Sequence, residues 1–336
     1  MAARAQAGFS LPEILVGISI GLLLLAAFIA TLDRCRSGFA ANASVASLHD
    51  TARHALSVLV ADVEHAGFLG FGNSAQPQLT HAGAVIADAM ALRQSAAPVA
   101  GVPPGSHDCG TNFAVDITLP VQATNNSFLA VPGARCTPTA TAGGARSGSD
   151  TLTLRRASLD TTDARVGRLQ LYTRRLESQG FGSLFADGVA PGPVDENAEV
   201  RDLEVHTYYV ANNSVGRPGW PALRARSLTE SGGHSQFRDE EILPGVEDLQ
   251  VQLSLQNAAT GTQTRVNDAS LDALREDKIV AVHLWLRIRA DQTESGFLDA
   301  RPMQYADVSF VPLGREARMR RMLVERTVAL WNQRSP

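Results

Sequence analysis

The stretch FSLPEILVGISIGLLLLAAFIATL, from Phe9 to Leu32, decides the fold. It holds 24 residues, of which only Glu13 is charged. At 1.5 Å per residue a helix of this length is about 36 Å long, and the hydrocarbon core of a bilayer is about 30 Å thick. A secretory signal peptide has a shorter apolar region of about 7 to 15 residues and then a small-residue cleavage site, which this stretch lacks. The sequence therefore predicts a transmembrane helix over residues 9–32.

Glu13 needs a positively charged partner. A carboxylate costs about 2.5 to 3.5 kcal/mol near the bilayer centre, and somewhat less this close to the edge. No Lys, Arg or His lies within the next 20 residues. A cut after Gly8 would place the new α-amino group of Phe9 one helical turn before Glu13, where a cation is needed. We therefore expect residues 1–8 to be a leader that is cleaved between Gly8 and Phe9.

The string GFSLPE at residues 8–13, followed by the apolar run, resembles the class III signal of type IV pilins and pseudopilins. In that family a membrane peptidase, the prepilin peptidase, cuts after the glycine, here Gly8, and N-methylates the new first residue, here Phe9. The resemblance gives Glu13 a role in assembly, because the fifth mature residue is thought to neutralise an N-terminal amine during docking into the filament. The alternative is an ordinary signal anchor whose Glu13 faces a partner helix.

Later strings resemble one branch of this family, the PilW minor pilins of type IV pili. They are HAGFLGFGN at 65–73, SDTLTLRRA at 149–157, VHTYYVANNS at 205–214, ILPGVEDLQVQL at 242–253 and ERTVALWNQR at 325–334. The resemblance implies a subunit that helps to initiate, assemble or cap the pilus. It implies as partners the prepilin peptidase, other minor pilins, the major pilin and the pilus assembly machinery. The competing hypothesis is a J-type minor pseudopilin of a type II secretion filament.

The same resemblance implies a location. The chain would lie in the inner membrane as a single-pass protein with its head in the periplasm, and then in the pilus, at the tip or elsewhere along it. Charge does not decide the orientation independently, since Arg4 lies on one side of the apolar run and Arg34 and Arg36 on the other.

The helix is expected to continue beyond the membrane, over residues 9–66. Residues 33–66 contain no proline, and Gly67 offers a left-handed stop. Arg53, Asp62 and Glu64 are placed on the polar faces. One apolar face recurs at helical spacing through Leu48, Ala52, Ala55, Leu56, Leu59, Val60 and Val63. This face does not hold the strict heptad of a coiled-coil stalk, so we expect it to rest on a globular head.

After Gly67 the apolar period changes from 3.6 to 2, which indicates strands. Strands are expected over residues 113–119, 151–155, 203–210, 249–255 and 280–288. The last has apolar residues on one face and His283, Arg287 and Arg289 on the other, so we expect a sheet covered on one side and wet on the other. The predicted fold is α+β: a long N-terminal α-helix packed on a β-rich, mostly antiparallel head over 67–336, with one lobe or two divided near 195–200.

Composition argues against several functions. The chain has 336 residues, with 30 Lys+Arg against 34 Asp+Glu and a net charge of −4, so a dedicated nucleic-acid binder is disfavoured. The basic run from Arg315 to Arg334 is interpreted as a charged face or subunit contact. Lys278 is the single lysine and lies in no recognisable motif, and no Gly-x-Ser-x-Gly string is present. We expect no enzymatic activity, no cofactor and no metal.

The cysteines are too few for a disulfide scaffold and lack C-x-x-C spacing. In the extracytoplasmic domain that the resemblance implies, we expect Cys109 and Cys136 to form a disulfide, worth about 3.6 kcal/mol in the chain-entropy model. The alternative is two unpaired thiols too far apart. Cys35 is expected to be a small packing residue.

Two polar clusters remain. His107, Asp108 and Cys109 could ligate zinc in principle, but no second cluster has comparable spacing. The run Asp239–Glu241 is interpreted as an exposed acidic turn in preference to part of a calcium site.

Overall fold

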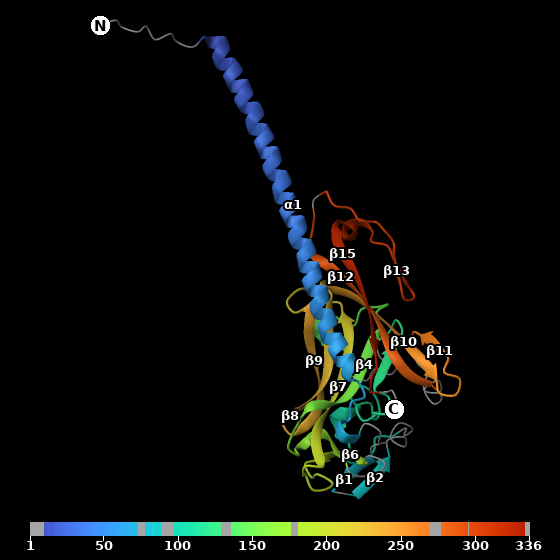
Figure 1. Ribbon diagram of the computed structural model, residues 1–336. Helices are drawn as coiled ribbons and strands as arrows, with labels where there is room; N and C mark the ends of the chain where they lie inside the picture. The colour runs from blue at the N-terminus through green and yellow to red at the C-terminus, as the bar shows by residue number, and fades with distance from the viewer. Residues whose placement is uncertain are drawn as a thin grey trace.

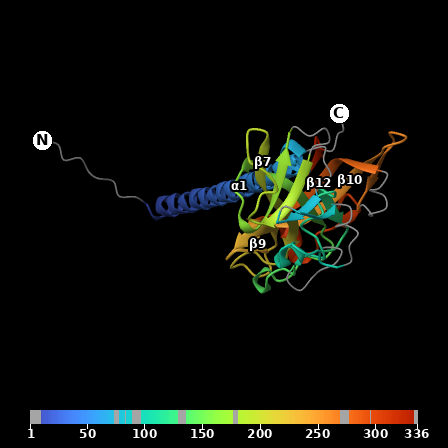
Figure 2. The same ribbon diagram turned by 90° about the horizontal axis from the view of Figure 1, so that it is seen from below.

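The computed structural model describes residues 10–72, 78–82, 84–88, 97–128, 136–175, 181–268, 277–294 and 296–332. A long helix, α1, projects from one end of a strand-rich head, as Figures 1 and 2 show. This is the predicted α+β architecture. The expected cleavage position, between Gly8 and Phe9, lies outside the described residues.

Helix α1 runs over Leu11–His65, a length of 55 residues. It begins after the N-cap Ser10, with Pro12 in the first turn, where its missing N–H costs nothing. It ends one residue before Ala66, and Gly67 adopts φ 76°, the left-handed conformation that was expected. The Gly67 amide donates to the carbonyl of Arg155 at 2.9 Å, which ties the end of the helix to the head.

The larger sheet has nine strands in the described part of the chain. The order is β2-β1-β6-β5-β7-β4-β3, and β8 pairs with both β7 and β9. All of these pairs are antiparallel except β1 with β6. The strands are β1 (Gln78–His81), β2 (Ala84–Asp88), β3 (Val121–Thr124), β4 (Thr151–Thr161), β5 (Val166–Arg174), β6 (Phe181–Asp187), β7 (Ala198–Ala211), β8 (Ala222–Ser231) and β9 (His234–Pro244).

The smaller sheet is antiparallel, in the order β11-β10-β12-β15. Its strands are β10 (Val246–Asn257), β11 (Gln263–Val266), β12 (Asp277–Thr293) and β15 (Met319–Ala329). A separate hairpin pairs β13 (Met303–Tyr305) with β14 (Val308–Phe310). Short 3-10 turns are η1 (Gly70–Gly72), η2 (Pro104–His107), η3 (Ala140–Ala142) and η4 (Gly314–Arg318).

One hydrophobic cluster joins the second half of α1 to both sheets. The helix contributes the expected face, with Leu48, Ala52, Ala55, Leu59 and Val63 buried and Leu56 and Val60 partly buried. The larger sheet adds residues of β3, β4, β7 and β8, and the smaller sheet adds the apolar faces of β10 and β12. Helix packing, not a coiled coil, therefore covers this face.

A second cluster covers the opposite side of the larger sheet. It holds Leu169, Leu171, Leu184, Leu203 and Val205 from the strands, packed under the segment that contains Cys109. The predicted strand over 113–119 lies in this segment and is wrong: these residues form successive turns. Its apolar side chains are buried, but its amides close local bonds, such as that from Val115 to the carbonyl of Asn112 at 3.1 Å. Burial alone therefore produced the apolar pattern.

The predicted wet face of residues 280–288 is also wrong. His283, Arg287 and Arg289 are buried. The β13–β14 hairpin covers Arg287, whose guanidinium carbon lies 3.7 Å from the centroid of the Phe310 ring. These polar residues line a covered face because partners on the neighbouring strands satisfy them there: Glu247 of β10 pairs with both arginines, and hydroxyls of β10 and β15 bond to His283.

Residues 195–200, where a break between two lobes was considered, comprise the end of the β6–β7 connection and the first three residues of β7. Both strands pair with β5 in the same nine-stranded sheet. Asp195 and Asn197 form the turn, with the Asn197 amide donating to Asp195 Oδ1 at 2.9 Å. The division of the head into lobes stays a prediction.

Candidate assembly site

The first half of α1 extends away from the head without support from it. The most apolar window of 18 residues in the helix has a mean hydropathy of 2.6, and none of it is buried within the chain. Figure 1 shows this half of the helix standing clear of every strand. Exposed leucine, isoleucine and phenylalanine side chains on all sides of a helix require an apolar surrounding. The segment is therefore long and apolar enough to be inserted in a membrane or among other helices.

Glu13 lies in the first turn of this exposed segment. Its Oε2 accepts two bonds from the N-cap residue, from the Ser10 amide at 2.8 Å and from the Ser10 hydroxyl at 2.8 Å. The bond from the Ser10 amide is one half of a capping box between these two residues, which satisfies donors that the start of a helix otherwise leaves free. Within residues 10–72, no bond to Oε1 is seen. The carboxylate is thus held at the end of the helix with one oxygen directed to no group of the described head.

The helix surface beyond Glu13 is open at its glycines. A Cβ built on Gly17, Gly21 or Gly38 would have no atom within 4 Å, apart from the helix itself. Gly17 and Gly21 are four residues apart on one face, the spacing that lets apolar helices approach closely. Gly17 and Gly21 therefore leave a surface without side chains next to Glu13, on which another helix can pack closely.

The other end of α1 is fixed to the head by a buried carboxylate. Asp62 Oδ1 accepts from Arg156 Nε of β4 at 2.8 Å. Asp62 Oδ2 lies 2.8 Å from His206 Nδ1 and 3.1 Å from the Tyr208 hydroxyl, both of β7. Arg156 in turn reaches Glu204 at 2.5 Å. A single helical side chain is thereby joined to two strands of the larger sheet.

Burial alone would raise the pKa of Asp62, but the hydrogen bonds and charges of His206 and then Arg156 lower it to about 2. Burial alone would lower the pKa of His206, but the hydrogen bond and charge of Asp62 outweigh it and raise that pKa above the ordinary value. Burial and the charge of Asp62 raise the pKa of Tyr208. The group is therefore an ion pair at neutral and acidic pH, with the tyrosine a neutral donor.

Placing Asp62 on a polar face was wrong. It is buried with the apolar stripe. A signal existed in its spacing, because Asp62 lies three residues after Leu59 and seven after Ala55, on the same side of the helix. The prediction followed the charge of Asp62 and not this spacing. The three partners that stabilise the buried carboxylate are more than 90 residues away in the sequence, so no local pattern indicates them.

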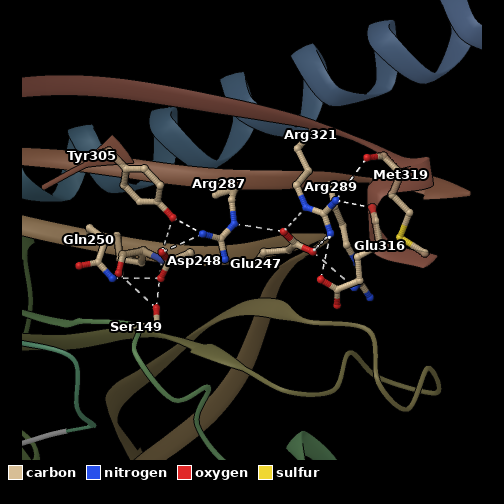
Figure 3. A network of polar contacts seen from close by, with 11 residues as sticks. Ser149, Glu247, Asp248, Gln250, Arg287, Arg289, Tyr305, Glu316, Met319 and Arg321 are labelled. Atoms are coloured by element: carbon tan, nitrogen blue, oxygen red, sulfur yellow. Dashed lines mark hydrogen bonds and ion pairs between the residues drawn. The ribbon is translucent and has the colours of Figure 1, made fainter. Parts of the chain in front are cut away.

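A second buried carboxylate, Glu247 of β10, fixes the last strand (Figure 3). Arg321 of β15 binds it with two donors, Nε at 2.7 Å and Nη2 at 3.0 Å. Arg287 and Arg289 of β12 approach it at 3.2 and 3.5 Å. Burial alone would raise the pKa of Glu247, but Arg321 and then the other two arginines lower it.

The same cluster continues to the β13–β14 hairpin. The Tyr305 hydroxyl donates to Asp248 Oδ2 at 2.6 Å and accepts from Arg287 Nη1. These contacts lie side by side in Figure 3. Sequence reasoning assigned Arg287 and Arg289 to solvent and gave no role to Glu247, and nothing in the local pattern shows that three arginines from two strands meet one glutamate.

The predicted disulfide is present. Cys109 and Cys136 are bonded, with Cα atoms 4.7 Å apart, and both are buried against the larger sheet. Cys35 is a free, exposed thiol on α1, so within this chain it packs against no core.

The two polar clusters have structural roles. Cys109 is in the disulfide, and the His107 ring accepts from the Asn112 amide at 2.9 Å. The expected acidic turn is wrong, because Asp239–Glu241 lies within strand β9, where Asp239 accepts from Arg224 Nε at 3.0 Å. In the described part of the chain, no group of three or more His, Cys, Asp or Glu residues is arranged to hold a metal ion.

Two sequence families match this chain. The profile of the Prokaryotic N-terminal methylation motif matches residues 3–29, and that of the Type IV Pilus-assembly protein W, PilW, matches residues 207–332. The chain therefore carries an N-terminal methylation motif and a PilW domain. Both matches concern structural families, not catalytic ones.

Solved structures give a weaker likeness. The type IV-like pilin TTHA1219 from Thermus thermophilus is 14% identical, with a TM-score of 0.27, over 59% of this chain and 82% of that one. No curated protein matches the chain.

The PilW domain contains the smaller sheet and the Glu247 cluster in full. Its first residues, in β7, include Tyr208, which donates to Asp62 of α1. The PilW domain and the prepilin helix are therefore joined directly by a buried polar contact.

Proposed function

We propose that this PilW-domain protein is a minor pilin, cleaved by the prepilin peptidase between Gly8 and Phe9 and N-methylated at Phe9. It then rests in the inner membrane with its head in the periplasm and enters a type IV pilus, where it helps to initiate, assemble or cap the filament with other minor pilins and the major pilin.

One observation carries this proposal: half of a continuous helix of 55 residues is apolar on all sides and stands free of the head. A lipid bilayer can surround this half before assembly, and the helices of other subunits can surround it afterwards. The head end of the same helix is fixed by Asp62, so the helix and the head move as one subunit.

Glu13 determines how far the helix is inserted among the helices of neighbouring subunits. Its Oε2 is already engaged by Ser10, which orients the carboxylate at the helix start. A protonated amine at Phe9, of this subunit or of its neighbour, would neutralise the charge in surroundings of low dielectric, where an unpaired carboxylate is costly. A helix inserted one turn too high or too low would leave the two charges apart.

The test is incorporation of Glu13→Gln, which keeps the size of the side chain and removes its charge. Cells carrying the variant should process it normally, while sheared pili contain much less of it than of the parent. Ser19→Ala, within the same exposed segment, is the control. Equal recruitment of Glu13→Gln and Ser19→Ala would remove the role of the carboxylate.

Deleting the gene separates the proposed function from that of a J-type pseudopilin. A minor pilin predicts loss of twitching motility with intact secretion of exoproteins. Loss of secretion with normal motility would assign the chain to a type II secretion filament instead.

A further inference from the structure

The most exposed large apolar side chains outside residues 9–32 gather at one end of the described head. They are Phe39 (78% exposed), Leu313 (74%) and Leu298 (71%). Single exposed apolar residues need no explanation, but three of them at the same end, far apart in the sequence, indicate a surface.

This end is the one nearest to the apolar half of α1. The last three residues of β12 and the following Glu294 face Ser37 and Ala40 of the helix across a cavity of about 470 Å³. From there the chain runs beside η4, because the Glu294 amide donates to the carbonyl of Arg318 at 3.0 Å and the Asp299 amide to that of Ala317 at 2.8 Å. Leu298 and η4 are therefore neighbours, and Figure 1 shows this loop alongside α1 at the end of the head from which the helix projects.

The distance from this end to the apolar segment is short. Ser37 follows Leu32 by five residues, which corresponds to about 7.5 Å of helix. The polar layer on each side of the hydrocarbon core is about 5 to 7 Å thick. When residues 9–32 span the bilayer, Ser37 is thus at the outer boundary of the headgroup layer, and the loop that carries Leu298 begins across the cavity from it.

Exposed cations accompany the apolar residues. Arg315 and Arg318 lie on η4, and Arg34 and Arg36 lie on α1 just beyond the apolar run; all four are exposed. No ion pair of these four side chains is seen among the residues that the structure describes. The acidic groups at this end include Asp33, Glu316, Asp291, Glu294 and Asp299. Four of them have a basic partner: Asp291 pairs with Arg217, Glu294 with Arg320, Asp299 with Arg301 and Glu316 with Arg321.

We propose that this end of the head, formed by Phe39, Leu298, Leu313, Arg315 and Arg318 and here called the membrane-proximal edge, docks on the surface of the anionic bilayer in which α1 is anchored. The leucines and the phenylalanine enter the headgroup layer, and the arginines bind lipid phosphates. The inference rests on the membrane insertion of residues 9–32 that the proposed function includes.

Contact of the membrane-proximal edge with the bilayer also determines the tilt of the helix. The apolar run is about 36 Å long in a core of about 30 Å, and a helix accommodates such an excess by tilting. A tilt towards the side that carries β12 and η4 brings the membrane-proximal edge closer to the bilayer surface. Anchors of this kind, and not the length of the run, determine the direction of tilt.

The experiment uses the full chain in vesicles that contain phosphatidylglycerol, with Cys35→Ser as background. Single cysteines replace Leu298, Leu313, Val166 or Leu24, each carries a fluorescent label, and quenching by nitroxide lipids is measured. Val166 is the matched control, since it is 68% exposed but does not belong to the membrane-proximal edge. The next residue, Gly167, lies against Gly233 in the turn between β8 and β9. Leu24 reports insertion of the helix.

Labels at Leu298 and Leu313 should be quenched several-fold more than the label at Val166, and Arg315→Gln with Arg318→Gln, or vesicles of phosphatidylcholine alone, should reduce the difference. Quenching at Leu24 with equal, weak quenching at the three head positions would overturn the dock and leave the proposed function intact. If the label at Leu298 is shielded from solvent in detergent, and only when a second copy of the chain is present, the membrane-proximal edge is a subunit contact instead. Absence of quenching at Leu24 would contradict the proposed function itself.

Discussion

Asp62 of α1 and His206 of β7 face each other with Oδ2 and Nδ1 2.8 Å apart, at the buried junction of the helix and the head. Together with the buried apolar face of α1, this pair fixes the orientation of a helix of 55 residues on the head. A rotation of α1 about its own axis would take Asp62 away from His206 and leave both charges buried without partners.

Asp62→Asn should lower the free energy of unfolding of the head by about 3 kcal/mol, because it breaks a buried charge pair with His206 and leaves Arg156 with Glu204 as its one acidic partner among the described residues. Denaturant unfolding in detergent measures the loss, and hydrogen exchange should show faster exchange in residues 52–65. Asp50→Asn, an exposed substitution on the same helix, should change the stability by less than about 0.5 kcal/mol. Equal effects of the two variants would exclude an anchoring role.

His206 should make the stability fall as the pH rises. Its pKa is raised in the folded chain, since Asp62 and Glu204 favour the charged form more than Arg156 and burial oppose it. The contribution is fully present below the ordinary pKa of about 6.5 and is lost as the pH passes through the raised value. His206→Gln should flatten the profile of unfolding free energy above the ordinary histidine pKa of about 6.5, and His49→Gln, on an exposed site, should not.

Replacing both Cys109 and Cys136 by serine should cost about 3.6 kcal/mol, the closure entropy of a loop whose ends are 27 residues apart. The melting temperature of the double variant should equal that of the parent under reducing conditions. Cys35→Ser should leave it unchanged because that thiol is free and exposed. A parent chain that melts at the same temperature with and without reductant would contradict this role of the bond.

Glu247→Gln should release β15 from the smaller sheet. The variant leaves Arg321, Arg287 and Arg289 buried without their shared carboxylate, at a cost of about 3 to 5 kcal/mol. Because the pKa of Glu247 is lowered in the folded chain, its contribution is present at neutral pH and lost as the pH falls through that lowered value. Hydrogen exchange of residues 319–329 reports the release, with Glu325→Gln, exposed on the same strand, as the control.

The sequence predicted those parts of the fold in which a local pattern and a local cause agree. The helix followed from an apolar run, a proline-free continuation and Gly67. The cores of β4, β7, β10 and β12 followed from alternating or continuous β-prone residues. Pairing of Cys109 with Cys136 needed only the compartment and the number of cysteines in the head.

The predictions were wrong where apolar residues are buried without forming a strand, and where polar residues are buried instead of exposed. Residues 113–119 are apolar because they cover a sheet, and they make turns instead of a strand. Arg287 and Arg289 alternate as a solvent face would, yet β13 and β14 cover them and Glu247 neutralises them. Such partners come from strands that are remote in the sequence, so only the tertiary structure brings them together.

The central claim is that Glu13 acquires its counter-charge when the chain is cut after Gly8. The most direct test is the intact mass and N-terminal sequence of the protein isolated from assembled pili. The proposal predicts a chain that starts at Phe9 and carries one N-methyl group. Chains recovered from functional pili with Met1 or Ala2 still at their start would contradict it.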